Sequence, residues 1–411
     1  MKLKRFKAQD HKRKFIIIFT VCCIFLLAGV FLYTTFAVFT EEKEFNVING
    51  KYQDPGDLYF AFYVDGEITN TFPNKDSGYT LDEAQSSCTN GAEITWDNDT
   101  WSAAINFSNY FVGNMSRTKC TMYFVEMSFS DSILACNDTA ANCITKNADK
   151  NTEELVYDET VDNNLRCIGS DVNNYVLFND ELWRLMEVMN NVVLEDGTTT
   201  SLLKIVRNES IGEYSFDNNR SFKNIYSEVG IKDTLNSGPY WNRTSGTCPF
   251  MIGALSSTLT TACDFTNIGL TENAKTMISS VVWNLGAVDL SSSISEVYVQ
   301  ERSGNTTWTG YVGLVYPSDF LYSVNLSEEC SEKTPSEGSE TCYDDGYLHM
   351  GYSITALAST TNSAIRVGDG LINAAWPTWN PMHIYPSLYL NSDIKIVSGT
   401  GVESDPYIFS L

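Results

Sequence analysis

Residues 376–383 are the part of the sequence best suited to contacting a ligand, because two tryptophans and a histidine stand there among two prolines. Prolines restrict the backbone, and Trp and His offer flat, amphipathic surfaces at a small entropic cost. Such a loop can stack on a sugar or anchor a partner protein, although Trp376 and Trp379 could equally fill the core beneath it. If the C-terminal hairpins converge, other side chains share its rim. The predicted ligand-binding residues are Trp376, Trp379, His383, Tyr347, His349, Arg366 and Asp369.

Residues that support nucleophilic catalysis are scarce. The chain has three histidines, and it contains no G-x-S-x-G motif to present a nucleophilic serine. Acidic pairs such as Asp344-Asp345 and Glu328-Glu329 are common. A glycosidase needs two carboxyl groups facing each other across a cleft, and spacing in the sequence cannot show this. We therefore predict no catalytic residue, and enzymatic activity stays open.

Metal-binding motifs are also missing from the sequence. It has no C-x-x-C pair and no EF-hand loop, so we predict no metal ligand and no cofactor. A calcium ion held by an acidic loop such as 393–405 is compatible with an acidic extracellular module.

The charge is distributed unevenly along the chain. Residues 1–14 hold seven basic side chains against Asp10 alone. The whole chain carries a formal net charge of −24, so the other 397 residues carry −30. A body this acidic repels phosphate backbones, which argues against nucleic-acid binding.

Residues 15–39 read as a single transmembrane helix, since these 25 residues contain no charge and no proline. A helix of this length crosses a hydrocarbon core of about 30 Å and contacts membrane lipid. The basic head 1–14 then stays in the cytoplasm. The alternative is a cleaved signal peptide with a weak site at residues 35–37. Both interpretations place residues 41–411 outside the cytoplasm.

Nine cysteines follow the apolar run, and an exported chain favours disulfides. The simplest scheme joins neighbours in sequence, although eight cysteines allow about 105 connectivities. Cys167 is left over, either as a buried thiol or as a bridge to another subunit. The predicted disulfides are Cys88–Cys120, Cys136–Cys143, Cys248–Cys263 and Cys330–Cys342.

Strand and turn signals divide the exported part into domains. Residues 45–127 predict a small β-sandwich-like domain, with strands at 58–64, 91–96 and 120–125. Residues 128–165 are polar and read as a linker. Residues 166–411 predict a larger mixed α+β domain, so the expected fold class is strand-dominated α+β.

The larger domain opens with a hairpin signal. Asn179-Asp180 separates two apolar runs, and 202–206 adds a third strand to the meander. Apolar spacing predicts a helix that begins after the N-cap Thr271 and ends at Gly286. Further strands are expected at 310–316, 364–367, 371–372 and 384–390, with Gly368-Asp369-Gly370 closing the hairpin between the second and third of these.

Three parts of this domain, taken together, carry a resemblance to known proteins: 173–184 with 204–212, then 312–319, and 385–390 with 399–407. They resemble a large group of uncharacterised, N-terminally anchored surface proteins of low-GC Gram-positive bacteria. The C-terminal part of that group is similar to the C-type-lectin and formylglycine-generating-enzyme-like fold. The resemblance implies an α+β module for ligand display and supplies no catalytic residue.

We therefore expect a membrane-anchored, extracellular binding or adhesion protein that recognises a glycan or a protein. The alternatives are a cell-envelope hydrolase that uses paired carboxylates and a structural protein of envelope assembly.

Overall fold

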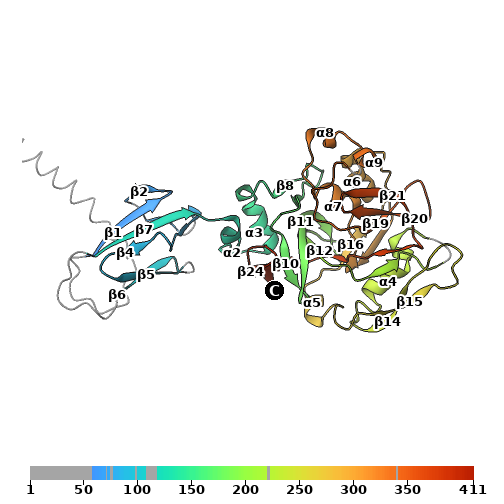
Figure 1. Cartoon of the computed structure of the whole chain (residues 1–411), viewed down its shortest axis with the longest axis horizontal. Helices are drawn as coiled ribbons and strands as arrows, with labels where there is room; N and C mark the ends of the chain where they lie inside the picture. Colours follow the sequence, from blue (N-terminus) through green and yellow to red (C-terminus); the bar gives the residue numbers. More distant parts are fainter. Residues whose placement is uncertain are drawn as a thin grey trace, which may run out of the picture. The chain divides into compact units, whose positions relative to one another are not determined.

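The computed structural model describes residues 58–411, except 71, 75–76, 98–99, 108–117, 220–222 and 339–340. The basic head and the predicted anchor 15–39 lie outside the described residues. Within the described part, no helix is long and apolar enough to cross a membrane. The chain divides into two compact units between Val125 and Glu126, and Figure 1 shows that both are rich in strands. The strand-dominated α+β class is therefore confirmed.

The first unit contains, among its described residues, seven strands in two sheets. These are β1 (Leu58–Val64), β2 (Glu67–Thr69), β3 (Tyr79–Leu81), β4 (Ser87–Cys88), β5 (Ala92–Asp97), β6 (Ser102–Phe107) and β7 (Thr118–Glu126). One sheet has the order β2-β1-β7-β3, with β4 also paired to β7, and β5 and β6 form the other. Trp96 of β5 packs edge-to-face on Phe124 of β7, with ring centroids 5.8 Å apart. The apolar sides of the two sheets thus share one core, as in a sandwich.

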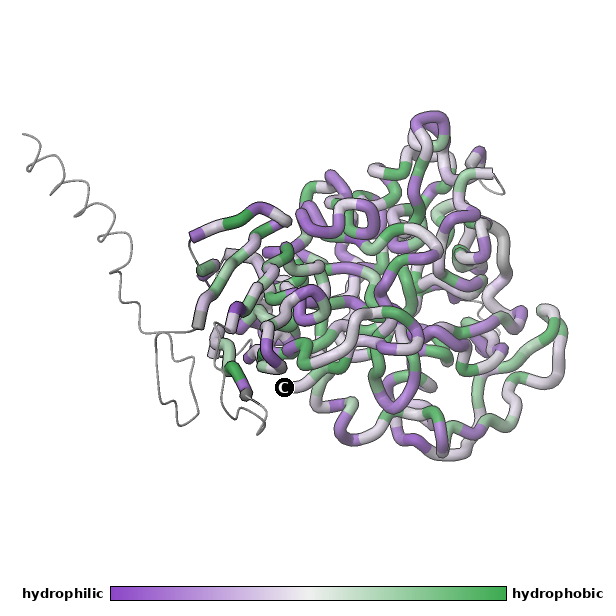
Figure 2. The backbone as a smooth tube through the Cα atoms, turned by 60° about the vertical axis from the view of Figure 1, so that its left-hand side comes forward, coloured by the Kyte–Doolittle hydropathy of each residue, from purple (hydrophilic) through white to green (hydrophobic). Residues whose placement is uncertain are grey.

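The second unit is built around a large mixed sheet with the order β18-β23-β12-β11-β10-β25-β24. Strand β9 also pairs with β11, and β8 pairs with β9. The central strands β11 and β12 are buried along most of their length, so both faces of the sheet are covered. Figure 2 shows hydrophilic residues in many of the loops at the periphery of this unit. The strands of this sheet are β8 (Leu155–Tyr157), β9 (Leu165–Cys167), β10 (Tyr175–Phe178), β11 (Glu181–Val193), β12 (Thr199–Arg207), β18 (Val312–Gly313), β23 (Ser387–Tyr389), β24 (Lys395–Ser398) and β25 (Tyr407–Ser410).

Smaller sheets and short helices complete the second unit. The additional strands are β13 (Glu213–Ser215), β14 (Ser245–Pro249), β15 (Thr260–Asp264), β16 (Val281–Asn284), β17 (Thr307–Gly310), β19 (Gly351–Ala356), β20 (Ser363–Gly368), β21 (Leu371–Pro377) and β22 (Pro381–His383). The helices are α2 (Phe129–Leu134), α3 (Ala140–Lys146), η3 (Ala148–Lys150), η4 (Tyr226–Glu228), α4 (Gly230–Asn236), α5 (Glu272–Thr276), α6 (Ile294–Arg302), α7 (Pro317–Leu321), α8 (Glu328–Ser331) and α9 (Pro335–Gly338).

The hairpin between β10 and β11 confirms the turn predicted at Asn179-Asp180. Both residues have positive φ, 58° and 62°, which matches the twist of the flanking strands. Strand β12 continues the meander by pairing with β11. The second predicted hairpin is also present, because Asp369 and Gly370 turn β20 into β21.

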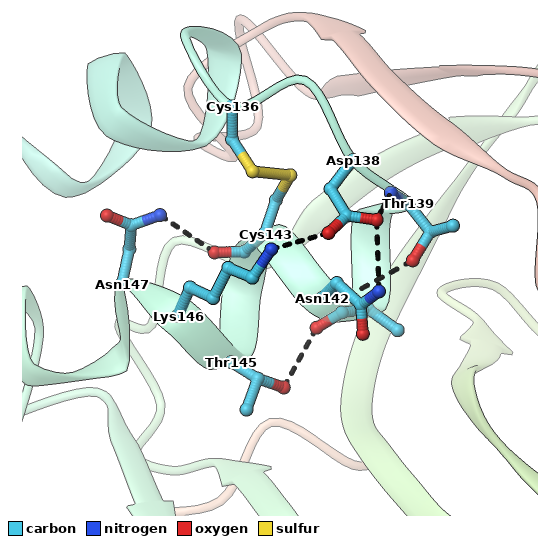
Figure 3. The surroundings of a disulfide bond; sticks show 9 residues. Cys136, Asp138, Thr139, Asn142, Cys143, Thr145, Lys146 and Asn147 are labelled. Carbon is cyan, nitrogen blue, oxygen red and sulfur yellow. Dashed lines mark hydrogen bonds and ion pairs between the residues drawn. A yellow bond between two sulfur atoms is a disulfide. The ribbon is translucent and has the colours of Figure 1, made fainter. Parts of the chain in front are cut away.

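The predicted linker 128–165 is wrong. This segment contains two helices, α2 and α3, whose apolar faces belong to the core of the second unit. The disulfide Cys136–Cys143 joins the end of α2 to α3, and Lys146 forms an ion pair of 2.5 Å with Asp138 (Figure 3). Short helices bury few residues each, so their surface polarity dominates the sequence pattern.

The predicted helix after Thr271 is correct only at its start. Thr271 caps α5 by accepting a hydrogen bond from the Ala274 amide, but the helix ends after Thr276. Residues 281–284 form β16 instead, which pairs with β17. The β-branched Val281 and Val282 favour a strand, and the pairing partner overrides the helical spacing. Of the strand expected at 310–316, Gly310 ends β17 and Val312–Gly313 form the short β18, while Pro317–Leu321 is helical.

All four predicted disulfides are present, and Cys167 is a buried free thiol.

Candidate functional site

Several of the predicted ligand-binding residues gather on one exposed surface. We call it the histidine patch: His349, Asp369, Tyr385, His383 and Glu213. His349 Nδ1 lies 3.3 Å from Asp369 Oδ1, and His383 Nε2 lies 3.4 Å from Glu213 Oε1. The Tyr385 ring stands between the two imidazoles, with centroids 6.0 Å and 6.3 Å away. Ion-pair and ring contacts thus link these five side chains, and the crevice that His349 and Tyr385 line has a volume of only about 10 Å³.

Tyr347 lies beneath this patch and is buried. It lines a crevice of about 10 Å³ together with Arg184, whose guanidinium lies 4.9 Å from the Tyr347 ring centroid. Burial raises the pKa of the Tyr347 hydroxyl well above its ordinary value, and no described residue forms a hydrogen bond with this hydroxyl. The volume suits about one water molecule, so a sugar ring cannot enter the crevice.

The loop 377–380 is fastened to neighbouring strands. The Trp379 carbonyl accepts a hydrogen bond of 2.8 Å from Ser215 Oγ, and the Tyr352 hydroxyl donates to the carbonyls of Pro377 and Asn380. Trp379 is half-buried, and so is Arg366 on β20. The side chain of Trp376 lies outside the described part of the structure. Three hydrogen bonds thus hold the backbone of this loop to Ser215 of β13 and Tyr352 of β19.

A larger groove lies elsewhere on the second unit, beside β8. Its volume is about 290 Å³, close to the lower limit for small-molecule sites in proteins. We call it the tyrosine groove. One wall is formed by Val156 and Tyr157, which are 41% and 40% exposed. Tyr322 at the end of α7 and the segment 324–326 that follows it also line the groove.

The floor of the tyrosine groove is an ion pair. Arg166 Nε donates to Asp158 Oδ2 at 2.9 Å, and the Arg166 guanidinium lies 5.4 Å from the centroid of the Tyr322 ring. Burial raises the pKa of Tyr322 to about 12, so its hydroxyl keeps its proton at neutral pH. Glu159 is exposed at the rim. A groove with one exposed carboxylate and a neutralised floor favours a neutral or cationic ligand.

A tight turn holds the β8 side of the groove in place. Asp158 accepts five hydrogen bonds: from the Thr160 amide and hydroxyl at 3.1 Å and 2.7 Å, the Asn164 amide and side chain at 3.0 Å and 2.9 Å, and Arg166 Nε at 2.9 Å. Burial alone would raise the pKa of Asp158, but Arg166 and these donors outweigh it and lower the pKa below its usual range. A charged Asp158 therefore organises the turn.

Behind the floor lies a buried charge network: Asp158, Arg166, Glu187, Lys204 and Asp319. No member has a side chain more than 3% exposed. Arg166 contacts all three carboxylates, and Lys204 Nζ lies 2.5 Å from Asp319 Oδ2 and 3.6 Å from Glu187 Oε1. Glu187 and Asp319 thus share the same two cations.

This network contains the paired carboxylates that a hydrolase would need. A glycosidase needs its two acids about 5–9 Å apart, with substrate between them. Glu187 and Asp319 are buried and share the same two cations, Arg166 and Lys204. The network thus gives no support to a hydrolase, although it is the most polar part of the core. No cluster of three or more His, Cys, Asp or Glu able to hold a metal ion occurs among the described residues.

Sequence reasoning missed the tyrosine groove and the network. The groove was missed because 128–165 was predicted to be a linker, although the apolar run at 155–157 indicates a strand. Lys204 interrupts the apolar run at 202–206, and a lysine in a strand with both faces buried signals a buried charge. The sequence could not predict its partners, because Asp319 lies 115 residues away in the chain and only the fold brings it to Lys204.

Comparison with known proteins identifies no relative of this chain. No family model matches the chain, and neither a curated protein nor a solved structure is significantly similar to it.

Proposed function

We propose that this chain is an N-terminally anchored extracellular protein that binds a glycan in the tyrosine groove. The observation that carries the proposal is the groove itself: a cavity of about 290 Å³ between tyrosines on a body with four disulfides. Disulfides persist in oxidising surroundings, which supports an exported body. The uncharged run 15–39 supports the anchor.

The chemistry of the walls favours a glycan over other ligands. Sugar rings stack their C–H faces on aromatic rings, and both Tyr157 and Tyr322 line the groove. Sugar hydroxyls are both donors and acceptors, and Glu159 and the Asn325 amide at the rim can satisfy them. An anionic ligand is disfavoured by Glu159 and by the acidity of the chain.

A protein ligand is the competing outcome, and one observation supports it. Among the described strands, β8 pairs only with β9, so its other edge is open beside the groove. An extended peptide could add to this edge and place one side chain in the cavity. The glycan proposal is favoured because β8 spans only three residues, which offers few backbone hydrogen bonds.

The experiment is a glycan-array screen of the full chain in detergent, followed by titration of the glycans that bind. Tyr322→Ala and Tyr157→Ala should each weaken binding about 2- to 12-fold, since an aromatic contact contributes about 0.5–1.5 kcal/mol. Tyr311→Ala is the matched control, because Tyr311 is partly exposed and packs on Trp241 outside the groove. Its affinity should equal that of the unmodified chain.

Two results would contradict the proposal. Binding that survives both groove substitutions but is lost in His349→Ala or Trp379→Ala would move the site to the histidine patch and its loop. Absence of any glycan ligand, together with peptide binding that depends on Tyr157, would favour the protein ligand.

A further inference from the structure

Lys204 occupies an uncommon position for a lysine, because it is fully buried in the middle of the main sheet. It lies on β12 directly opposite Glu187 of β11 in the strand register. Its ammonium is 2.5 Å from Asp319 Oδ2, at the beginning of α7, and 3.6 Å from Glu187 Oε1. An amine, a carboxyl acceptor and a second carboxyl group thus meet at one point.

Aromatic rings enclose this point. Lys204 Nζ lies 4.4 Å, 5.3 Å and 5.8 Å from the ring centroids of Tyr316, Tyr389 and Trp283. All three rings are buried, so water has no described path to the amine. In such surroundings, a charged pair that becomes neutral gains the desolvation free energy that its charges cost.

The carboxyl group of Asp319 is held and polarised by other donors. Oδ2 accepts a hydrogen bond of 2.6 Å from the Tyr316 amide, and Oδ1 accepts one of 3.2 Å from Arg166 Nη1. Donors fixed in this way stabilise negative charge that develops on an oxygen when the carboxyl carbon is attacked. Burial would raise the pKa of Asp319, but Lys204, Arg166 and the Tyr316 amide outweigh it and lower the pKa, so attack on Cγ requires that a proton first reach this carboxylate.

Glu187 is placed to move protons between the two groups. Its Oε1 lies 3.6 Å from Lys204 Nζ, and Arg166 Nη1 pairs with both its carboxylate and that of Asp319. Burial raises its pKa to about 7, so it exchanges a proton near neutral pH. Arg166 remains charged throughout, because the surrounding carboxylates outweigh burial and raise its pKa.

We propose that Lys204 Nζ and Asp319 Cγ become joined by an intramolecular amide bond. The Lys204 ammonium gives a proton to the Glu187 carboxylate, Glu187 passes this proton to Asp319, and the free amine attacks Asp319 Cγ. The tetrahedral carbon then loses one oxygen, which leaves as water with two of the three ammonium hydrogens, carried by Glu187. An ammonium and a carboxylate thus yield one amide and one water, and no oxidant or cofactor is needed.

The bond would have a structural consequence for a protein exposed outside the cell. It would tie β12 to α7 and close a loop across the 115 positions that separate Lys204 from Asp319. Disulfides close only short loops in this unit, the longest spanning 15 positions. The amide bond would also survive reducing agents, which the disulfides do not.

The test is peptide mass mapping of the full chain after reduction and trypsin digestion. The expected product is peptide 185–207, uncut at Lys204, linked to peptide 303–333, with a mass lower than the sum of the two by one water, about 18 Da. A separate peptide that ends at Lys204, together with an unlinked peptide 303–333, would overturn the proposal. This readout uses the unmodified chain, so it does not depend on the folding of any variant.

Two variants test the role of Glu187. Glu187→Gln keeps the shape of the side chain but cannot relay a proton, so the linked peptide should be lost. Glu181→Gln is the matched control, because Glu181 lies on the same strand and pairs with Arg207 away from Lys204. The linked peptide should persist in the control, and its persistence in Glu187→Gln would overturn the relay.

Discussion

Replacement of Asp158 by Ala tests whether the turn beside the tyrosine groove is held by a buried charge. Asp158 is joined by five hydrogen bonds to Thr160, Asn164 and Arg166. Its removal leaves Arg166 buried with one partner fewer. Breaking a buried ion pair from one side typically costs about 3–5 kcal/mol. Arg166 keeps Glu187 and Asp319, so we expect a loss near the lower limit, about 3 kcal/mol.

A matched control is available in the same unit. Asp196 accepts hydrogen bonds from the Thr198 amide at 2.9 Å and the Thr198 hydroxyl at 2.7 Å, the same local pattern that Asp158 forms with Thr160. Asp196 is exposed and has no arginine partner among the described residues. Asp196→Ala should therefore cause a much smaller loss, and the difference between the two variants isolates the buried charge.

The assay is equilibrium urea unfolding followed by tryptophan fluorescence, which the buried Trp183 and Trp283 report. Because the pKa of Asp158 is lowered in the folded state, its contribution is complete above its ordinary value near 3.8 and is lost as the pH falls below it. Asp158→Ala should remove that acid dependence. Equal losses in Asp158→Ala and Asp196→Ala would refute the reasoning.

Three further predictions concern the second unit. Burial raises the pKa of Glu301 to about 7, so the stability that this group contributes is complete below its ordinary pKa near 4.5 and is lost as the pH rises toward 7. Glu301→Gln should therefore flatten the dependence of the unfolding free energy on pH in this range, measured by urea unfolding. An unchanged slope would contradict the raised pKa of Glu301. Asp180→Gly should raise the free energy of unfolding by about 0.5 kcal/mol, since Asp180 has a positive φ that glycine adopts without strain; a loss in the same assay would contradict this. Replacing Cys248 and Cys263 together by Ser should lower the free energy of unfolding by about 3 kcal/mol, because the disulfide closes a loop of 15 positions. Calorimetry of the variant and of the unmodified chain measures this loss. An unchanged melting temperature would show that the disulfide does not constrain the unfolded state.

Local chemistry made several parts of the fold predictable. The Asn179-Asp180 turn follows from the tolerance of both residues for positive φ. The disulfides join neighbours in sequence, so the simplest pairing was sufficient. Thr271 was identified as a cap because its hydroxyl can accept from an amide three residues later.

Features that depend on distant partners were not predictable. Val281–Asn284 is a strand because β17 supplies its hydrogen bonds, and helical spacing alone could not reveal that partner. The tyrosine groove joins β8 to the end of α7, more than 150 positions later in the chain. The buried charge network combines groups from three separate regions, so only the folded arrangement brings Lys204 to Asp319.

The central claim is that an anchored, oxidised body presents a binding groove outside the cell. The most direct measurement is protease treatment of intact cells combined with alkylation of the cysteines under denaturing, non-reducing conditions. We expect added protease to digest residues 58–411 and Cys167 to be the single alkylated cysteine among the nine that follow residue 39. A body protected from protease, with all nine of these thiols alkylated, would contradict the central claim.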